Sequence, residues 1–147
     1  MKHRFGSIVL DTAFRVLVPF TLLYGFYVLV HGEYSPGGGF QAGALLAAGV
    51  LIARLVQGEE AVYDLSGNKA VVLAGLGAGL YALIGFITMV FGGKFLEYGR
   101  LPLSVHDPAE LHVYGILGIE IGVTIGVMAT IIAIFDALTR GEDLYDD

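Results

Sequence analysis

Residues 31–40 read His-Gly-Glu-Tyr-Ser-Pro-Gly-Gly-Gly-Phe, and they interrupt a chain that is otherwise strongly apolar. Long apolar runs lie on both sides of this stretch. A proline followed by three glycines ends a helix, because proline lacks a backbone donor and glycine loses much conformational freedom when it is ordered. A plain surface turn needs fewer residues and no triple glycine. The stretch therefore predicts a specially shaped joint between two helices.

The composition is typical of an integral membrane protein. The chain has 147 residues, of which 56% are hydrophobic and 15% are charged, and its mean hydropathy is +0.75. Soluble domains carry about 25% charged residues. The lack of cysteine excludes disulfides, thiolate zinc sites and iron–sulfur ligation. The net charge of −6 comes partly from an acidic tail at 142–147, and no basic patch indicates a nucleic-acid partner.

Four apolar runs are long enough to cross a bilayer, which takes roughly 20 residues. They lie at about 12–30, 40–56, 70–91 and 108–138. No run alternates with the period of two that a membrane barrel needs. We expect an all-α integral membrane protein with about four transmembrane helices in a single domain, 1–147. Asp11 and Arg15 interrupt the first run, so we expect a retained helix and not a cleaved signal peptide.

The distribution of Lys and Arg predicts the orientation, because these residues favour cytoplasmic loops. With the N-terminus inside, the inner side holds six of them and the outer side two: Lys2, Arg4, Arg15, Arg54, Lys69 and Arg140 against Lys94 and Arg100. Both termini are therefore expected in the cytoplasm, and the joint on the outer side. We expect Arg15 to pair with Asp11 or to snorkel, and Arg54 to snorkel to the interface.

Small residues recur at every fourth position of three runs: Gly118, Gly122 and Gly126; Gly75 and Gly79; Gly39, Gly43 and Ala47. This spacing forms a flat helix face that lets another helix approach closely. Glu120 lies about 200° around its helix from Gly118 and from Gly122. A carboxyl that faces lipid is costly, so the Glu120 face needs to be covered as well as the glycine face. Four helices struggle to cover both faces of one helix. We therefore infer a subunit of a larger membrane assembly.

Glu120 is the strongest candidate for ion chemistry, because an intramembrane carboxylate is by default a functional-site hypothesis. It would hold or pass a proton or Na⁺, with Thr124 one turn further on. His112, at the mouth of the last run, would collect protons, since an imidazole titrates near neutral pH. The alternative is that Glu120 is a protonated, hydrogen-bonded packing residue.

A metal site at the mouth of the last run is not expected. His106, Asp107, Glu110 and His112 gather there, but their spacing matches no tight ligand pattern. Helix capping explains Asp107 as N-cap and Glu110 in the first turn, with Pro108 as the first helical residue. We expect neither a metal nor a cofactor, and we find no nucleophile–base arrangement that would make the chain an enzyme.

Two interpretations of the joint stay open. It is either a flexible surface hairpin or backbone that packs closely on another helix at membrane depth. A P-loop is excluded, because the GK[ST] ending is missing. We favour close packing, with Pro36, Gly37, Gly38 and Gly39 as the turn, Phe40 as its anchor and Gly43 on the small face. His31 and Glu33 would pair with a neighbouring protein or be ordinary interfacial residues.

The stretch HGEYSPGGGFQAG, residues 31–43, resembles the signature of the MnhB proteins of Mrp-type (Mnh-type) multisubunit Na⁺/H⁺ antiporters. The residues that carry the resemblance are His31, Gly32, Pro36, Gly37, Gly38, Gly39, Phe40 and Gly43. The family implies a small non-catalytic subunit of a prokaryotic plasma membrane. It works beside large proton-pumping subunits related to those of respiratory complex I, with Na⁺ and H⁺ as transported ions. The same module occurs in archaeal membrane-bound hydrogenases, which implies peripheral redox subunits as alternative partners.

Two alternatives to an ion-path subunit stay open. One is a pure scaffold, in which Glu120 only holds helices together. The other is a small homo-oligomeric transporter. No lysine lies within any expected span, so a lone Glu120 lacks the charged partners that coupling two ions requires. This favours coupling machinery in other subunits.

Overall fold

The computed structural model describes residues 8–32, 37–57, 65, 67–105 and 108–142. Four long helices form there: α1 (Ile8–Val30), α2 (Gly39–Gln57), α3 (Asn68–Val90) and α4 (Pro108–Glu142). A short 3₁₀ helix, η2 (Tyr98–Arg100), lies between α3 and α4. All four α-helices are long and apolar enough to cross a membrane, and the described residues contain no strand. The expected all-α fold with four spans is confirmed.

The observed helices extend slightly beyond the expected runs. α1 begins four residues early and continues through Pro19, and α4 begins at Pro108 as expected. α4 has 35 residues, or about 52 Å at 1.5 Å per residue, which exceeds the roughly 30 Å of a hydrocarbon core. It must therefore tilt or extend beyond the bilayer. The side chain of Asp11 and the acidic tail lie outside the described part, so the Asp11–Arg15 pair stays a prediction.

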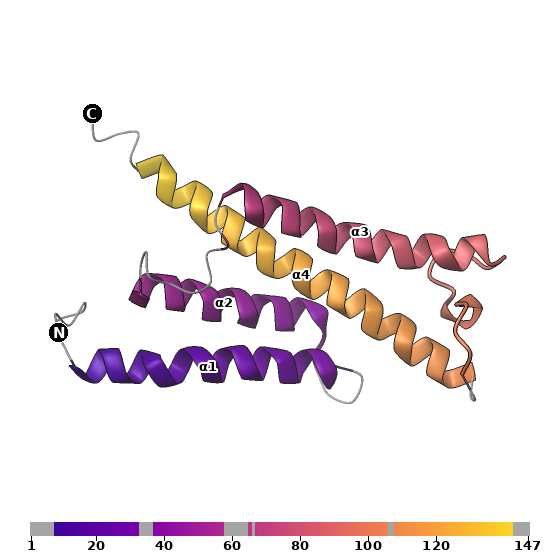
Figure 1. Ribbon diagram of the computed structural model, residues 1–147, viewed down its shortest axis with the longest axis horizontal. Coiled ribbons are helices and arrows are strands. Elements are labelled where there is room, and N and C mark those ends of the chain that lie inside the picture. The colour runs from indigo at the N-terminus through magenta and orange to yellow at the C-terminus, as the bar shows by residue number, and fades with distance from the viewer. Residues whose placement is uncertain (1–7, 33–36, 58–64, 66, 106–107, 143–147) are drawn as a thin grey trace.

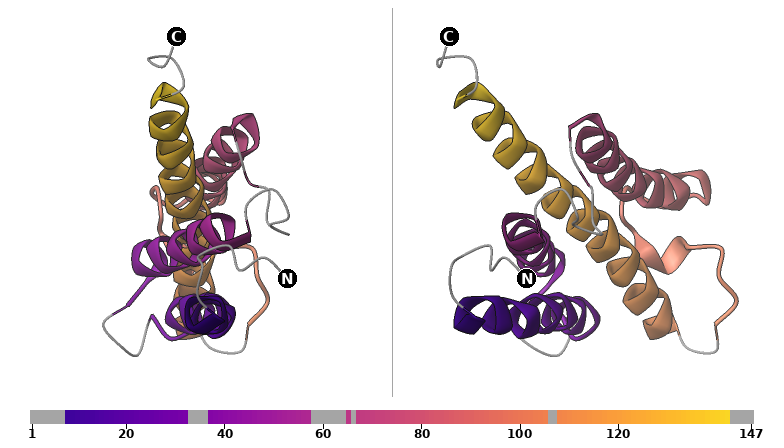
Figure 2. Two further views of the ribbon diagram at one scale, coloured as in Figure 1. Left: turned by 90° about the vertical axis from the view of Figure 1, so that its left-hand side faces the viewer. Right: turned by 60° about the vertical axis from the view of Figure 1, so that its left-hand side comes forward.

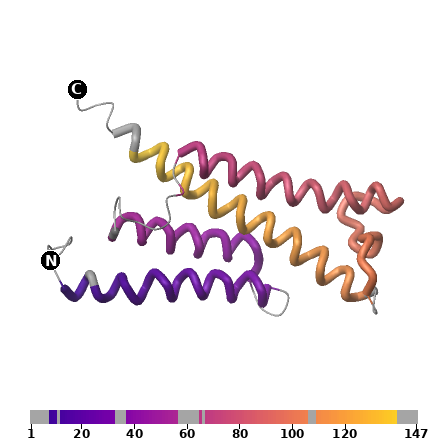
Figure 3. Tube along the Cα trace, viewed as in Figure 1, coloured from indigo at the N-terminus to yellow at the C-terminus, as the bar shows by residue number. Residues whose placement is uncertain are grey.

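The helices form an open row in the order α1, α2, α4, α3 instead of a closed bundle (Figures 1 and 2). α4 crosses between α2 and α3 and packs on both of them. Among the described residues, the backbones of α1 and α2 do not approach that of α3. The tube in Figure 3 shows that α3 and α4 continue past the point where α1 meets α2. The joint therefore meets α4 part-way along its length.

α2 and α4 run parallel along a largely apolar seam. Gly39 lies against Glu120 near the start of α2, and Arg54 binds Asp136 near its end. Between these contacts lies the apolar core, in which Ala47, Val50 and Ile132 are buried. The beginning of α1 and the end of α2 lie at the same end of the molecule (Figure 1). Which side of the membrane this end faces stays a prediction.

Candidate functional site

The glycine joint and Glu120, which the sequence marked separately, lie against each other. A Cβ built on Gly32 would lie 3.0 Å from Glu120 Oε1, and one on Gly38 would lie 3.3 Å from it. A Cβ on Gly39 would lie only 2.5 Å from the Glu120 carbonyl oxygen. Any side chain at Gly39 would push α2 away from α4. The glycines thus let the chain turn directly against the Glu120 turn of α4.

The joint also sets the start of α2. Gly38 is buried and has φ +153°, a conformation that side chains disfavour. The Ala42 N–H donates to the Gly38 carbonyl at 3.0 Å and closes the first turn of α2. The N-terminal end of α2 therefore lies beside the Glu120 carboxylate, and free amide groups at a helix start favour a negative charge. The burial of Gly38 and Gly39 favours the close-packing interpretation over a surface hairpin.

Glu120 lies deep in an apolar span. It is eleven residues beyond Ala109, the start of the span Ala109–Thr139, or about 17 Å along the helix axis. The side chain is half-buried, and its Oε2 atom is fully buried. An ionisable group at this depth is costly, and it is therefore by default a functional-site hypothesis.

Thr124 forms a hydrogen bond across the seam. Its hydroxyl is buried and donates to the Gly39 carbonyl at 3.0 Å. One turn further along α2, a Cβ on Gly43 would lie 2.7 Å from the Thr124 carbonyl oxygen and 2.8 Å from Val127 Cβ. In this structure Thr124 ties α4 to α2, and its expected place in an ion path stays a prediction.

The glycine face of α4 packs on α3. A Cβ on Gly77 would lie 2.5 Å from the Gly126 nitrogen and 2.7 Å from the Gly122 carbonyl oxygen, while Gly118 faces Ile84. Glu120 faces α2 instead. Both faces of α4 thus meet helices of this chain, contrary to the expectation that four helices would struggle to cover them. The case for a larger assembly has to rest on other observations.

Gly75 and Gly79 do not pack within the described part of this chain. A Cβ on either would meet no atom within 4 Å. Gly77, two residues from each and thus about 200° around the helix, is the residue that contacts α4. The small face of α3 was assigned to the wrong side for packing within the chain. Packing of Gly75 and Gly79 on another subunit stays a prediction.

Phe40 is not the anchor of the joint. Its side chain is 65% exposed, and Gly39 makes the close contact with α4 instead. Phe40 lines an open groove of about 430 Å³, together with Tyr81 of α3 and Thr130 of α4. Within this chain the expected anchoring role is therefore not observed, because Gly39 and not the Phe40 ring makes the close contact with α4.

Each of the two described histidines lies against an aromatic ring. His31 Nδ1 lies 3.2 Å from the Tyr27 carbonyl oxygen, and the two rings stack with centroids 4.1 Å apart. His112 meets Tyr98 of η2 edge to face, with centroids 6.3 Å apart. It precedes Glu120 by eight residues, or about 12 Å along the axis, so the structure does not bring the two together.

η2 covers the first turns of α4. Tyr98 lies over Gly115 and beside His112. Burial raises the pKa of the Tyr98 hydroxyl, and its Coulombic interaction with Tyr81 adds to the rise. Tyr98 therefore stays neutral at physiological pH.

Several expected site residues lie outside the described part: Glu33, Pro36, His106 and Asp107. Gly37 is half-buried at the start of the α2 turn. In the described ranges no group of three or more His, Asp or Glu side chains could hold a metal ion.

Asp136 is a polar residue that the sequence analysis missed. It is 6% exposed on α4, and its Oδ1 lies 2.7 Å from Nη2 of Arg54. The expected snorkelling of Arg54 was wrong, because a buried carboxylate holds its guanidinium inside the protein. An aspartate in the apolar run Ile131-Ile132-Ala133-Ile134-Phe135 to Leu138 was the available signal.

A family model described as a domain related to the MnhB subunit of Na⁺/H⁺ antiporter matches residues 9–133. The match spans the joint, Glu120 and most of all four helices. The chain belongs to the MnhB family. The resemblance carried by residues 31–43 is thereby confirmed.

MnhB relatives align along nearly their whole length. A putative antiporter subunit mnhB2 of Staphylococcus haemolyticus is 30% identical over 137 residues, which cover 93% of this chain and 97% of the relative. The corresponding Na⁺/H⁺ antiporter subunit of Bacillus subtilis is 27% identical over 137 residues, covering 88% and 96%. A putative mnhB2 of Staphylococcus aureus is 28% identical over 136 residues, covering 92% and 96%. This chain and these relatives therefore match along most of their lengths.

Proposed function

We propose that this chain is a small multi-pass plasma-membrane subunit of a multisubunit Na⁺/H⁺ antiporter module. The MnhB family match and the names of its full-length relatives support this function. The four apolar helices support the membrane location. The partners are other membrane subunits of the module, and the chain acts in transport without a catalytic site of its own.

The contact between Glu120 and the glycine joint carries the proposal of an ion-path role. The carboxylate sits deep in the span, beside the N-terminal end of α2, where Gly32 and Gly38 leave room for it. A carboxylate in such a place can take up and release a proton or bind Na⁺. Glu120 would be the residue of this chain that exchanges an ion with its neighbours.

The apolar seam between α2 and α4 limits where that ion can go. Ala47, Val50, Ala129 and Ile132 are 0–4% exposed and lie along α2 and α4 beyond the joint. The next carboxylate, Asp136, is sixteen residues or about 24 Å further along α4. A proton on Glu120 therefore leaves toward the joint or sideways to another subunit, not along this seam. Moving one charge across the membrane costs about 2.3 kcal/mol per 100 mV. The coupling of Na⁺ movement to H⁺ movement against this cost then falls to other subunits.

Affinity purification tests membership of the module. We would solubilise native membranes in mild detergent, isolate this chain and identify the co-purifying proteins by mass spectrometry. Antiporter-like subunits are expected. Additional nickel–iron or iron–sulfur subunits would place the module in a redox-driven ion pump. Recovery of this chain alone would contradict the proposal and favour the homo-oligomeric transporter.

The substitution Glu120→Gln tests the ion-path role. It keeps size and hydrogen bonding but removes the proton-binding site. We expect Na⁺/H⁺ exchange by the assembled complex to fall by at least about tenfold, or its pH dependence to change. Glu110→Gln, on the exposed first turn of the same helix, is the matched control. Unchanged exchange in Glu120→Gln would leave this chain a pure scaffold.

A further inference from the structure

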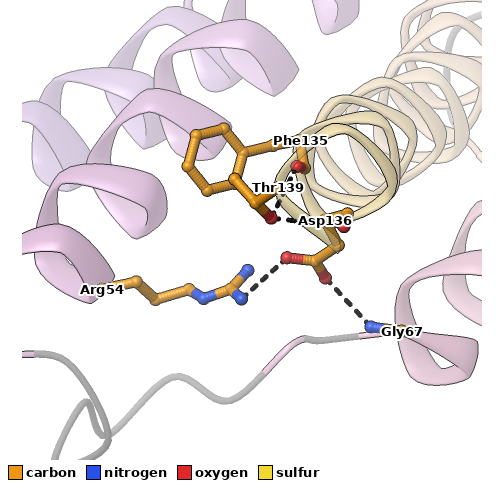
Figure 4. A network of polar contacts seen from close by, with 5 residues as sticks. All are labelled: Arg54, Gly67, Phe135, Asp136 and Thr139. Carbon is orange, nitrogen blue, oxygen red and sulfur yellow. Dashed lines mark hydrogen bonds and ion pairs between the residues drawn. The ribbon is translucent and has the colours of Figure 1, made fainter. Parts of the chain in front are cut away.

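One carboxylate joins three elements at the far end of the α2–α4 seam (Figure 4). Asp136 of α4 accepts a hydrogen bond from Arg54 Nη2 at 2.7 Å through Oδ1. Its Oδ2 accepts the Gly67 N–H at 2.9 Å. Arg54 lies in the last turn of α2, and Gly67 directly precedes α3. Asp136 therefore joins α2, α4 and the start of α3.

Local backbone geometry prepares this contact. Gly67 has φ 58° and ψ −128°, a conformation that glycine adopts more readily than other residues. This conformation directs its N–H to Asp136, while its carbonyl accepts the Ala70 N–H at 3.1 Å and starts α3. On α4, the Thr139 hydroxyl lies 3.0 Å and 3.2 Å from the carbonyl oxygens of Phe135 and Asp136. The turn of α4 that carries Asp136 is thus held by the Thr139 hydroxyl as well as by the contacts of the Asp136 carboxylate.

The pair is largely removed from solvent. The side chains of Arg54 and Asp136 are 22% and 8% exposed. Removal of one partner would leave an uncompensated charge, which is strongly destabilising. A buried ion pair contributes little net stability compared with an apolar pair, and its best attested use is to fix the register of packed helices.

The middle of the seam does little to fix that register. Ala47, Val50 and Ile132 are buried there, and the burial of apolar surface is non-directional. The close glycine contacts lie at the start of the seam, where Gly39 and Gly43 leave no space for a side chain against α4. Among the described residues, polar contacts between α2 and α4 occur at the two ends of the seam: Thr124 with Gly39, and Asp136 with Arg54. α2 is one unbroken helix between them, so a shift at Arg54 reaches Gly39, about 22 Å away.

We propose that Arg54 and Asp136 are positioning residues, a clasp that sets the register of α2 on α4 and thereby holds Gly39 against Glu120. The clasp also pins the start of α3 through Gly67, so it fixes the pair α1 and α2 relative to the pair α3 and α4. Its effect on transport rests on the proposed role of Glu120, whereas its effect on helix register does not.

A distance measurement tests the register directly. The chain has no cysteine, so spin labels can be placed on Ala48→Cys of α2 and Ile121→Cys of α4, both exposed positions. We would compare pulsed EPR distances in the full chain with Arg54→Gln, Asp136→Asn and the charge-conserving control Arg54→Lys. We expect the neutral variants to broaden or shift the distance by up to about 5 Å, one helical turn, and Arg54→Lys to keep it narrow.

The double variant Arg54→Gln with Asp136→Asn covers the case in which the single variants do not fold. It removes both charges together, so no unpaired charge remains buried. A distance distribution in this double variant equal to that of the parent chain would overturn the clasp. A broadened or shifted distribution would support it.

The pH profile of Na⁺/H⁺ exchange in the assembled complex is the second readout. We expect the double variant to shift this profile and Arg54→Lys to retain it, which a merely stabilising pair would not do. An unshifted profile in an assembled complex would remove the link between the clasp and Glu120. If Glu120→Gln leaves exchange intact, the proposed function fails, and the EPR distances still decide the clasp.

Discussion

Gly39 and Glu120 meet backbone to backbone: a Cβ on Gly39 would lie 2.5 Å from the Glu120 carbonyl oxygen. The glycine that opens α2 and the carboxylate buried in α4 are thus parts of one contact. Substitutions in the glycine joint are therefore expected to change the surroundings of the Glu120 carboxylate as well.

The substitution Gly39→Ala should separate α2 from α4 at this contact. The added methyl group has no space, and overpacking of this kind costs about 1–3 kcal/mol. We expect a lower melting temperature of the purified chain and a weaker Na⁺/H⁺ exchange. Gly79→Ala is the control, because a Cβ there meets nothing within 4 Å. Equal melting temperatures for the two variants would contradict the close contact.

The substitution Thr124→Val tests whether this hydroxyl ties helices or binds an ion. It removes the hydrogen bond to Gly39 at nearly constant volume, which should lower the free energy of unfolding by about 0.5–1.5 kcal/mol. Exchange by the assembled complex should persist, and Thr124→Ser should restore stability. Loss of exchange in a Thr124→Val complex of normal composition would instead assign Thr124 to the ion path.

The two faces of α3 should respond differently to larger residues. Gly77→Leu should disrupt packing on α4, since its Cβ alone would lie 2.5 Å from the Gly126 nitrogen. Gly75→Leu should leave the melting temperature of the isolated chain unchanged. In the complex, Gly75→Leu should reduce co-purification of a partner if that face packs on another subunit. Full co-purification would show that the Gly75 face meets lipid.

Tyr98 should make the fold sensitive to alkaline pH. Burial raises its pKa above the ordinary value of 10.0, so the folded chain keeps a proton that the unfolded chain loses. Above about pH 10 the folded chain binds more protons than the unfolded chain, so the free energy of unfolding should decline as the pH rises. Below about pH 10 both states keep the proton, and this contribution is fully present. Tyr98→Phe should lessen this decline in denaturation curves measured between about pH 9 and pH 11. Identical declines in both proteins would contradict burial of the hydroxyl.

The sequence predicted the elements of this protein better than their contacts. Four apolar runs gave the four helices, and Pro108 marked the start of α4, because hydropathy and capping are local properties. Residues 31–40 and Glu120 were both recognised as unusual. That they meet could not be predicted, since the order α1, α2, α4, α3 depends on which helix faces pack together.

The packing face of α3 could not be predicted, because two of its faces carry small residues at helical spacing. Gly75 and Gly79 satisfy the small-residue spacing, but Gly77, with Ala70, Ala74 and Ala78 nearby, offers an equally small face, and this face packs on α4. Asp136 carried a readable signal as the one acidic residue near the end of an apolar run. Its partner, Arg54, lies 82 residues away, and sequence spacing cannot pair them.

Carbodiimide modification tests the central claim most directly, because the reagent reacts with protonated carboxyls in apolar surroundings. We would treat the assembled complex over a range of pH and locate adducts by peptide mass spectrometry. The account predicts an adduct on Glu120 that declines as pH rises and blocks exchange, with Asp136 unmodified beside Arg54. Modification of Asp136 in place of Glu120, or no adduct on Glu120 at any pH, would contradict it.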